Sequence, residues 1–226
     1  MDSVLHLEDS VLQIMQNVSR VFQETGEDAM PLPDKLCINN KEGLALVREA
    51  GFPESKIARV EALRFLELKG RYQIFKKPVP LTKRTLLVIM GITDKENQFQ
   101  FQLLKEAAGV GALKNYKQIL VKPHPGISPG GLKSVYESNI ELSIMNESLS
   151  KLWSLTDVVY GAHSTGASWE ASWCGIPAIV VGPMGSLNLS PLTGLPEVQF
   201  VTNGTELSEQ LKNPRLAEIP EEFFFM

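Results

Sequence analysis

The sequence contains very little cysteine. Cys37 and Cys174 are the only two cysteines in 226 residues, they lie far apart, and neither belongs to a CxxC or Cys/His pattern. Disulfide scaffolds and structural zinc sites need a denser and more regular spacing of cysteine. Both classes are therefore excluded, a reducing compartment fits best, and we expect no metal site.

Positive charge is also scarce. The chain has 22 Lys and Arg residues against 26 Asp and Glu residues, which gives a formal net charge of −4 and a sequence pI near 5.5. A protein that binds nucleic acid mainly through phosphates needs a basic surface. Nucleic acid is therefore excluded as a partner, and any anionic ligand must be bound by a local arrangement of donors.

Long hydrophobic runs are missing. The longest apolar stretches, residues 86–92 and 176–181, are far shorter than the roughly 20 residues that cross a bilayer. The first residues include Asp2, Glu8 and Asp9 and no cationic segment, so no secretory signal is visible. We expect a cytoplasmic protein, and the sequence leaves open a peripheral association with the inner face of a membrane.

Three common ligand-binding signatures are absent as well. The chain contains no GxGxxG, no GxxxxGKS and no HExxH pattern. Nicotinamide dinucleotides, P-loop chemistry and zincin hydrolysis therefore lack their usual sequence features. We expect no cofactor.

The chain does contain a regular alternation of short apolar runs and amphipathic segments from Thr85 onward. We predict strands at residues 85–90, 118–122, 140–144, 158–160, 178–181 and 199–202, and helices through 104–108 and at 147–155, 168–173 and 205–211. This order is typical of an α/β protein with a parallel, doubly wound, Rossmann-like sheet.

The first third of the chain has a different pattern. We predict a helix at residues 9–22, a short strand at 35–38, and a helix at 41–50 that Asn40 caps and Gly51 ends. We therefore predict two regions: a helical, partial N-terminal or hinge region at 1–80, and a Rossmann-like domain at 81–226.

Polar and glycine residues follow three of the predicted strands. These segments are residues 91–94, 123–126 and 161–166. In doubly wound sheets, ligands bind outside the carboxyl ends of the strands. We therefore look for a ligand site in these three segments.

His124 lies between Pro123 and Pro125 as a strand ends. Two prolines fix the backbone, and such a turn normally faces water, which is unusual for a core histidine. An imidazole can donate a hydrogen bond to a phosphate or protonate a leaving group. His124 is our catalytic candidate, and the alternative is a rigid surface turn.

Ser164 and Thr165 lead from a short strand into a helix, where hydroxyls and unpaired backbone N–H groups can receive a phosphate. The alternative is an ordinary helix cap. Glu170, five residues after Thr165, either accepts hydrogen bonds from sugar or ribose hydroxyls or only complements the helix dipole.

Three further residues are weaker candidates. His163 precedes Ser164 and either contacts the ligand or is a solvent-exposed loop histidine. Lys122 either adds a positive charge beside His124 or is a solvated lysine at a strand end. Gly91 either lets the backbone approach a ligand closely or is a plain turn glycine.

These segments together resemble the donor-binding half of GT-B fold glycosyltransferases. The resemblance rests on a strand and glycine loop, then K-P-H-P at 122–125, then D-V-V-Y-G-A-H-S-T followed by E and G-I-P-A-I-V-V within 157–181. It is most similar to bacterial capsule and surface-polysaccharide enzymes. In those families the His-Pro and Ser-Thr turns bind the phosphate of a CMP- or CDP-linked donor, which implies this role for His124, Pro125, Ser164 and Thr165.

The resemblance implies a nucleotide sugar as substrate and a glycan or lipid-linked acceptor. A complete GT-B enzyme has two Rossmann-like domains, and this chain has room for one and a fragment. The acceptor half and its catalytic base would then come from a missing domain or a partner. We expect this chain to bind nucleotide without transferring sugar by itself.

Two alternatives stay open beside the glycosyltransferase. One is a nucleotide-binding or assembly module without turnover, and the other is a sugar-nucleotide epimerase of the same fold. The sequence also ends in Phe223-Phe224-Phe225, which we expect to pack on a groove or on the missing half.

Overall fold

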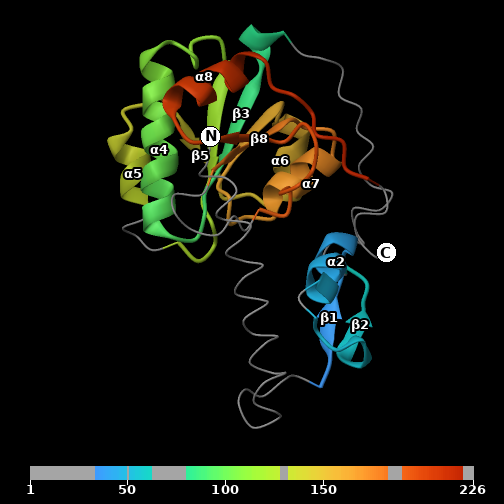
Figure 1. Ribbon diagram of the computed structural model, residues 1–226. Helices are drawn as coiled ribbons and strands as arrows, with labels where there is room; N and C mark the ends of the chain where they lie inside the picture. Colours follow the sequence, from blue (N-terminus) through green and yellow to red (C-terminus); the bar gives the residue numbers. More distant parts are fainter. Residues whose placement is uncertain (1–33, 50, 63–79, 128–131, 183–189, 221–226) are drawn as a thin grey trace. The chain divides into compact units, whose positions relative to one another are not determined.

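The computed structural model describes residues 34–49, 51–62, 80–127, 132–182 and 190–220 (Figure 1). These residues belong to two compact units: unit 1 holds the described residues up to 62 together with Pro220, and unit 2 holds those from 80 to 219. The domain boundary predicted between residues 80 and 81 stays a prediction. The predicted helix at 9–22 and the three C-terminal phenylalanines lie outside the described residues.

Unit 1 is a small βαβ motif. Strand β1 (Leu36–Ile38) leads into helix α2 (Lys41–Glu49), and β2 (Ile57–Arg59) follows the short 3-10 helix η2 (Glu54–Lys56) and pairs with β1 in parallel. Asn40 Oδ1 accepts a hydrogen bond from the Gly43 N–H, so the predicted cap is confirmed. Gly51, at φ 74°, ends the helix as predicted. The three-residue strand β2 was not predicted.

Unit 2 contains a six-stranded parallel sheet. Its strands are β3 (Thr85–Ile89), β4 (Gln118–Lys122), β5 (Ser143–Ile144), β6 (Val158–Gly161), β7 (Ala178–Val181) and β8 (Gln199–Val201). All six predicted strands are therefore confirmed in position, although β5 is only two residues long. The predicted doubly wound α/β class is correct.

The helices of unit 2 are close to their predicted positions. They are α4 (Asp94–Gly109), α6 (Leu149–Leu152) with the 3-10 turn η5 (Trp153–Leu155), α7 (Ala167–Trp173) and α8 (Gly204–Lys212). Thr93 caps α4 through its Oγ1, and Asn203 caps α8 through its Oδ1. Helix α5 (Lys133–Glu137) and the 3-10 turn η3 (Leu81–Lys83) were not predicted.

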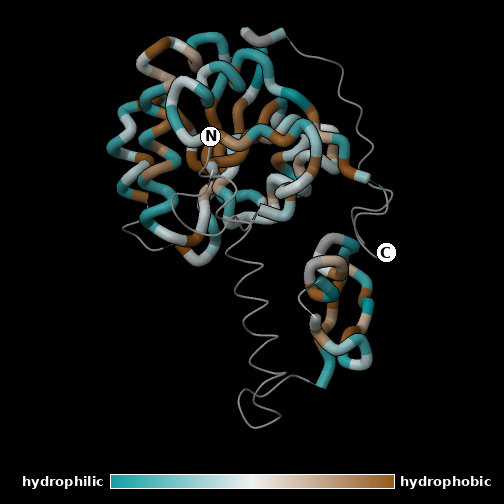
Figure 2. Tube along the Cα trace, in the orientation of Figure 1, coloured by the Kyte–Doolittle hydropathy of each residue, from teal (hydrophilic) through white to brown (hydrophobic). Residues whose placement is uncertain are grey.

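The core of unit 2 lies on both faces of the sheet. Every residue of β3, β6 and β7 is buried, which explains why these strands are continuously apolar rather than alternating. Alternate side chains of β3, such as Leu86 and Val88, pack with residues of α4 and α8 in one cluster. Helix α7 contacts β6 and β7. The strands are accordingly the most hydrophobic part of unit 2 in Figure 2.

The strand order defines where a ligand is expected. Across the sheet the order is β5-β4-β3-β6-β7-β8, so the first strand along the chain, β3, lies between the second, β4, and the fourth, β6. This is the Rossmann order, in which the chain reverses its direction of progress at the first strand. Ligands of such sheets bind at the carboxyl ends of the strands on either side of this switch point.

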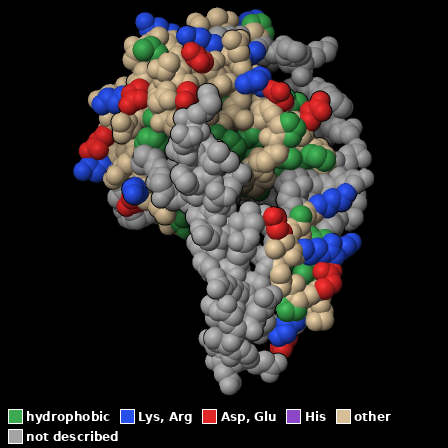
Figure 3. Space-filling view, viewed as in Figure 1, with side chains coloured by type: hydrophobic (Ala, Val, Ile, Leu, Met, Phe, Trp, Pro, Cys, Tyr) green, Lys and Arg blue, Asp and Glu red, His purple; other side chains and the backbone are tan. Residues whose placement is uncertain are grey.

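The surface of unit 2 mixes charges of both signs. In the face seen in Figure 3, Lys and Arg alternate with Asp and Glu over unit 2. None of the helices in the described part of the chain has both the length and the apolar character to cross a membrane.

Candidate ligand site at the switch point

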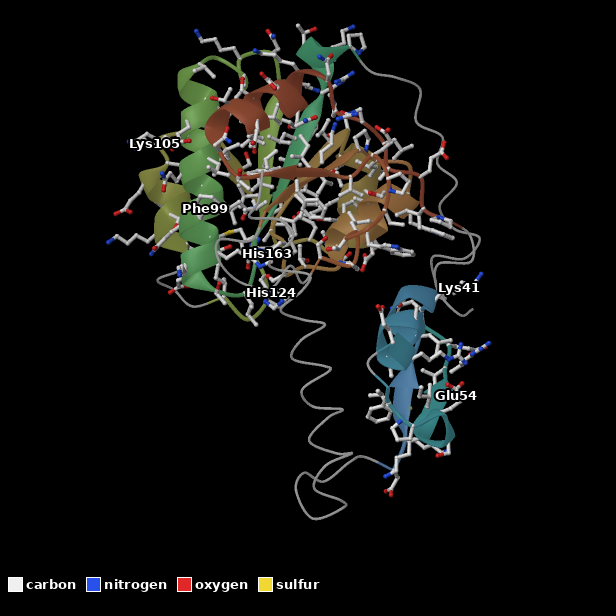
Figure 4. The ribbon with its side chains drawn as sticks, in the orientation of Figure 1. Lys41, Glu54, Phe99, Lys105, His124 and His163 are labelled. Atoms are coloured by element: carbon white, nitrogen blue, oxygen red, sulfur yellow. The ribbon has the colours of Figure 1, made fainter. Side chains whose placement is uncertain are left out.

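His124 and His163 lie at the same edge of the sheet. Ile89, the last residue of β3, is paired with Lys122 on β4 and with Gly161 on β6. His124 and His163 each follow two residues after these partners, and Figure 4 shows both at the same end of the sheet. Because β4 and β6 are two strand spacings apart, the two loops are separated by roughly 10 Å.

The His124 loop is a tight turn. The Ile127 N–H donates to the His124 carbonyl at 3.0 Å, which places Pro125 at the second position of a β-turn, where a fixed φ is favoured. The Gly126 N–H donates to His124 Nδ1 at 3.0 Å. The imidazole is half-buried and held by its own turn, as the two prolines suggested.

Lys122 is directed to one side of this turn. Its Nζ donates to the Asn146 carbonyl at 3.2 Å, just beyond β5. The ammonium group is exposed and lies on the β5 side of β4, whereas His163 follows β6 on the other side of β3. Its role in phosphate binding stays a prediction.

The centre of the edge is occupied by Glu96, in the first turn of α4. The Glu96 carboxylate accepts hydrogen bonds from the Ser164 N–H at 3.0 Å and from the Ser164 hydroxyl at 2.6 Å. His163 Nδ1 lies 2.7 Å from Glu96 Oε1. This last contact is electrostatic rather than a linear hydrogen bond, because the ring N–H does not point along the nitrogen–oxygen line.

These contacts determine the charge of Glu96. Burial raises the pKa of its carboxyl, but the contacts from His163 and from the Ser164 hydroxyl and N–H lower it by more. The resulting pKa lies below the ordinary value for Glu. Glu96 is therefore a buried carboxylate that stays ionised because donors from the β6–α7 loop surround it.

Gly91 has a clear reason to be glycine. A Cβ at this position would lie 2.1 Å from Glu96 Oε2 and 3.0 Å from Ser164 Oγ. The Gly91 N–H donates to Asn97 Oδ1 at 2.9 Å, and Asn97 Nδ2 donates to the Gly91 carbonyl at 3.1 Å. Gly91 thus makes room for Glu96, and Asn97 fixes the loop after β3.

Helix α4 also holds the ends of two strands together. The Gln100 side chain, which is fully buried, donates to the carbonyls of Ile89 on β3 at 3.0 Å and Tyr160 on β6 at 3.3 Å. The Tyr160 hydroxyl donates to the Gln100 carbonyl at 3.1 Å, and burial raises the pKa of Tyr160 well above its usual value. Buried hydrogen bonds from Gln100 and Tyr160 therefore connect α4 to the carboxyl ends of β3 and β6.

The turn before α7 has most of its donors in use. The Ser164 N–H binds Glu96, the Thr165 N–H donates to the Ala162 carbonyl at 3.4 Å, and the Ala167 N–H donates to Thr165 Oγ1 at 3.2 Å. The sequence suggested these N–H groups for a phosphate, but they have internal partners. Thr165 Oγ1 is the acceptor in its bond with Ala167, so its hydroxyl hydrogen can still donate to a ligand.

Glu170 lies in the first turn of α7, three residues into the helix, and is half-buried. Its predicted contact with ribose or sugar hydroxyls is not tested by this arrangement and stays a prediction.

Within the described parts of the chain, no three side chains of His, Cys, Asp or Glu come together as metal ligands.

Glu96, Asn97 and Gln100 were not among the residues predicted from the sequence. Their spacing was the available signal, because residues i, i+1 and i+4 share a face of a helix and this face also carries the buried Phe101 and Leu104. Buried polar side chains are hydrogen-bonded. Three polar residues on the buried face of a helix therefore indicate a polar network beneath it.

Known structures match the fold of the chain, whereas no protein-family model and no curated protein matches its sequence. A protein described as UDP-N-acetylglucosamine 2-epimerase from Listeria monocytogenes has a TM-score of 0.54 at 13% identity, over 77% of this chain and 49% of that chain. The UDP-GlcNAc 2-epimerase from Neisseria meningitidis, bound to UDP-GlcNAc, has a TM-score of 0.51 at 12% identity, over 76% and 51%. The wall teichoic acid polymerase TagF reaches 0.48 at 15% identity, over 91% and 50%, which is too weak to support an inference.

At these identities the likeness establishes the fold alone. The chain has a parallel, Rossmann-like sheet with the fold found in these structures, so the predicted fold class is confirmed. The chain spans about half the length of the two epimerase structures. The surface-polysaccharide type and the assignment to the C-terminal half stay predictions.

Proposed function

We propose that this chain is the nucleotide-sugar-binding part of a glycosyltransferase that builds a cell-surface polysaccharide. The observation that carries the proposal is the position of two loops. The His124 turn and the turn at residues 163–165 lie at one edge of the sheet, on either side of β3, where the strand order places the ligand of a Rossmann-like sheet.

His124 is the residue that contacts the donor phosphate in this proposal. Its Nδ1 accepts the Gly126 N–H, so the proton of the neutral ring lies on Nε2. The Nε2–H donates to a phosphate oxygen and stabilises the charge that grows there as the bond to the anomeric carbon breaks. Thr165 supplies a hydroxyl to the same phosphate, and Glu170 accepts hydrogen bonds from ribose hydroxyls.

The donor in this proposal is linked to CMP or CDP, which the resemblance of the two turns favours. The acceptor is a glycan or a lipid-linked sugar, and its binding site and catalytic base lie outside this chain, on a further domain or a partner. The reaction would take place in the cytoplasm, at the inner face of the membrane. About half the length of the matching structures is not covered by this chain, which is consistent with such a division.

An epimerase is the second candidate. The two structures with TM-scores above 0.5 are described as UDP-GlcNAc 2-epimerases, and one is bound to UDP-GlcNAc. Because the identities are 13% and 12%, this likeness favours a uridine nucleotide as a ligand to test rather than the reaction itself. A binding module without turnover is the third candidate.

The proposal is tested by calorimetry of the whole chain with CMP, CDP, UMP, UDP-GlcNAc and GDP. We expect a cytidine nucleotide to bind, and we expect His124→Ala to weaken it by about tenfold, since a charge-assisted hydrogen bond is lost. Tyr136→Ala, at an exposed position on α5, is the matched control and should leave binding unchanged. Tighter binding of UDP-GlcNAc would favour the epimerase, and absence of all binding would refute the proposal.

A further inference from the structure

Glu96 makes contacts that a helix cap does not need. The N-terminus of α4 is already capped by Thr93, whose Oγ1 accepts the Glu96 N–H at 3.3 Å. The Glu96 side chain instead reaches the β6–α7 loop, where it receives both donors of Ser164 and faces His163. Only 8% of Glu96 is exposed, so its carboxylate is largely shielded from water, and its contacts with Ser164 are partly buried.

The contact with Glu96 determines where the proton of His163 lies. Although the ring N–H is not aligned with the carboxylate, an ionised carboxylate 2.7 Å from Nδ1 repels a bare nitrogen lone pair and electrostatically stabilises a hydrogen on that nitrogen. The reverse arrangement, a protonated Glu96 donating to a bare Nδ1, is disfavoured because Ser164 supplies two donors to the same carboxylate. The low pKa of Glu96 agrees with the ionised form. Neutral His163 therefore carries its hydrogen on Nδ1 and has a lone pair on Nε2.

Only the part of the His163 side chain away from Nδ1 remains for a ligand. The Nδ1 atom is buried and the whole side chain is 12% exposed, so the exposed area belongs to the remainder of the side chain. The pairing also crosses the switch point, because Glu96 comes from the helix after β3 and His163 from the loop after β6.

In neutral His124 the hydrogen lies on the other ring nitrogen. Its Nδ1 accepts the Gly126 N–H, which leaves the hydrogen of the neutral ring on Nε2. The two histidines follow the strands on either side of β3, roughly 10 Å apart. One imidazole thus offers a donor at Nε2 and the other offers an acceptor.

We propose that Glu96 is a positioning residue that fixes the hydrogen of His163 on Nδ1. The site then recognises its ligand with one histidine that donates at Nε2, His124, and one that accepts at Nε2, His163. This inference rests on the proposed function. His124 Nε2–H donates to a phosphate oxygen of the nucleotide sugar, and His163 Nε2 accepts a hydrogen bond from a hydroxyl of the ribose or sugar. The ionised, esterified phosphates of a nucleotide sugar have acceptors only and can satisfy His124 but not His163, whereas the hydroxyls of the same ligand can donate to His163.

The tautomers are measured directly in the wild-type chain by two-bond ¹H–¹⁵N correlation spectra of the imidazole rings. The chain has three histidines, and the His6→Gln, His124→Gln and His163→Gln variants assign their signals. At a pH where the rings are neutral, we expect the Nδ1–H pattern for His163 and the Nε2–H pattern for His124. An Nε2–H pattern for His163, or an Nδ1–H pattern for His124, would overturn the proposal.

Glu96→Ala tests the positioning role, with Glu209→Ala on the exposed side of α8 as the control. In the Glu96→Ala variant, His163 should lose the Nδ1–H pattern while His124 keeps its own, and nucleotide binding should weaken about fivefold, the equivalent of one hydrogen bond. An unchanged His163 pattern or unchanged affinity would overturn the inference. If wild-type chain binds no nucleotide, the proposed function fails, and the wild-type spectrum still decides the tautomers.

Discussion

Glu96 shows how strongly a single residue can organise this site. Its carboxylate is buried, accepts two hydrogen bonds from Ser164 and lies beside His163. Removing it would leave the partly buried Ser164 N–H without its acceptor, and an unsatisfied buried donor costs about 1–3 kcal/mol. Glycine at position 91 belongs to the same arrangement, because any Cβ there would overlap the carboxylate.

Glu96→Gln should destabilise the protein in a pH-dependent manner. The pKa of Glu96 is lowered in the folded state, so its contribution is complete above the unfolded pKa of about 4.3 and is lost as the pH falls through the folded value. We expect Glu96→Gln to lower the free energy of unfolding by about 1–3 kcal/mol at neutral pH. The difference from wild type should shrink below about pH 4.

Urea unfolding followed by tryptophan fluorescence measures this difference. All three tryptophans, Trp153, Trp169 and Trp173, lie in unit 2, so the signal reports the unit that contains Glu96. Glu209→Gln serves as the control for loss of one exposed carboxylate. A difference that stays constant between neutral and acid pH would contradict the ionised state that we assign to Glu96.

The sequence allowed some residues of the site to be predicted but not how they are connected. His124 was recognisable because two flanking prolines and the end of an apolar strand place it on a turn. The partner of Ser164 was not recognisable, since Glu96 lies 68 residues away and the pairing exists only when β3 and β6 are neighbours. Local patterns report turns, whereas contacts across the sheet depend on strand order.

At the scale of elements, helix α4 does more than cover the sheet. Its first turns place three buried polar side chains, Glu96, Asn97 and Gln100, over the ends of β3 and β6. The rest of the buried face is apolar and packs in the main cluster with α8. The helix therefore joins the stable core to the edge where we place the ligand.

Asn97→Ala should loosen the loop after β3. The Asn97 side chain makes two hydrogen bonds with the backbone of Gly91, one to its N–H and one to its carbonyl, and both are buried. We expect a loss of about 2 kcal/mol in the free energy of unfolding, and faster hydrogen exchange at the Gly91 N–H. Gln98→Ala changes the exposed neighbour on the same helix and should alter neither quantity. Equal effects of the two substitutions would show that the Asn97 side chain does not hold the loop after β3.

The elements that were predicted well are those with long, continuous signals. The buried strands β3, β4 and β7 are apolar runs bounded by turn residues, and their positions were correct. Helix α5, with five residues, and strand β2, with three, are too short to show a period. Strand β5 was predicted too long, because only Ser143 and Ile144 pair with β4.

At the scale of the whole molecule, the strand order explains why the predicted loops meet. Three loops that are separated by up to 70 residues along the chain follow neighbouring parallel strands, so they reach the same edge. The class of sheet was predictable from the alternation of strands and helices. The order of the strands was not, since alternation is the same for every doubly wound sheet.

The central claim is that the His124 turn and the turn at residues 163–165 bind one nucleotide together. A titration of the ¹⁵N-labelled chain with CDP, followed by ¹H–¹⁵N correlation spectra, tests it most directly. We predict that the N–H signals of Gly126, Ser164 and Thr165 shift together and give one dissociation constant, while those of Glu209 and Gln210 on α8 stay in place. Shifts confined to one of the two turns, or different constants for the two, would contradict the account.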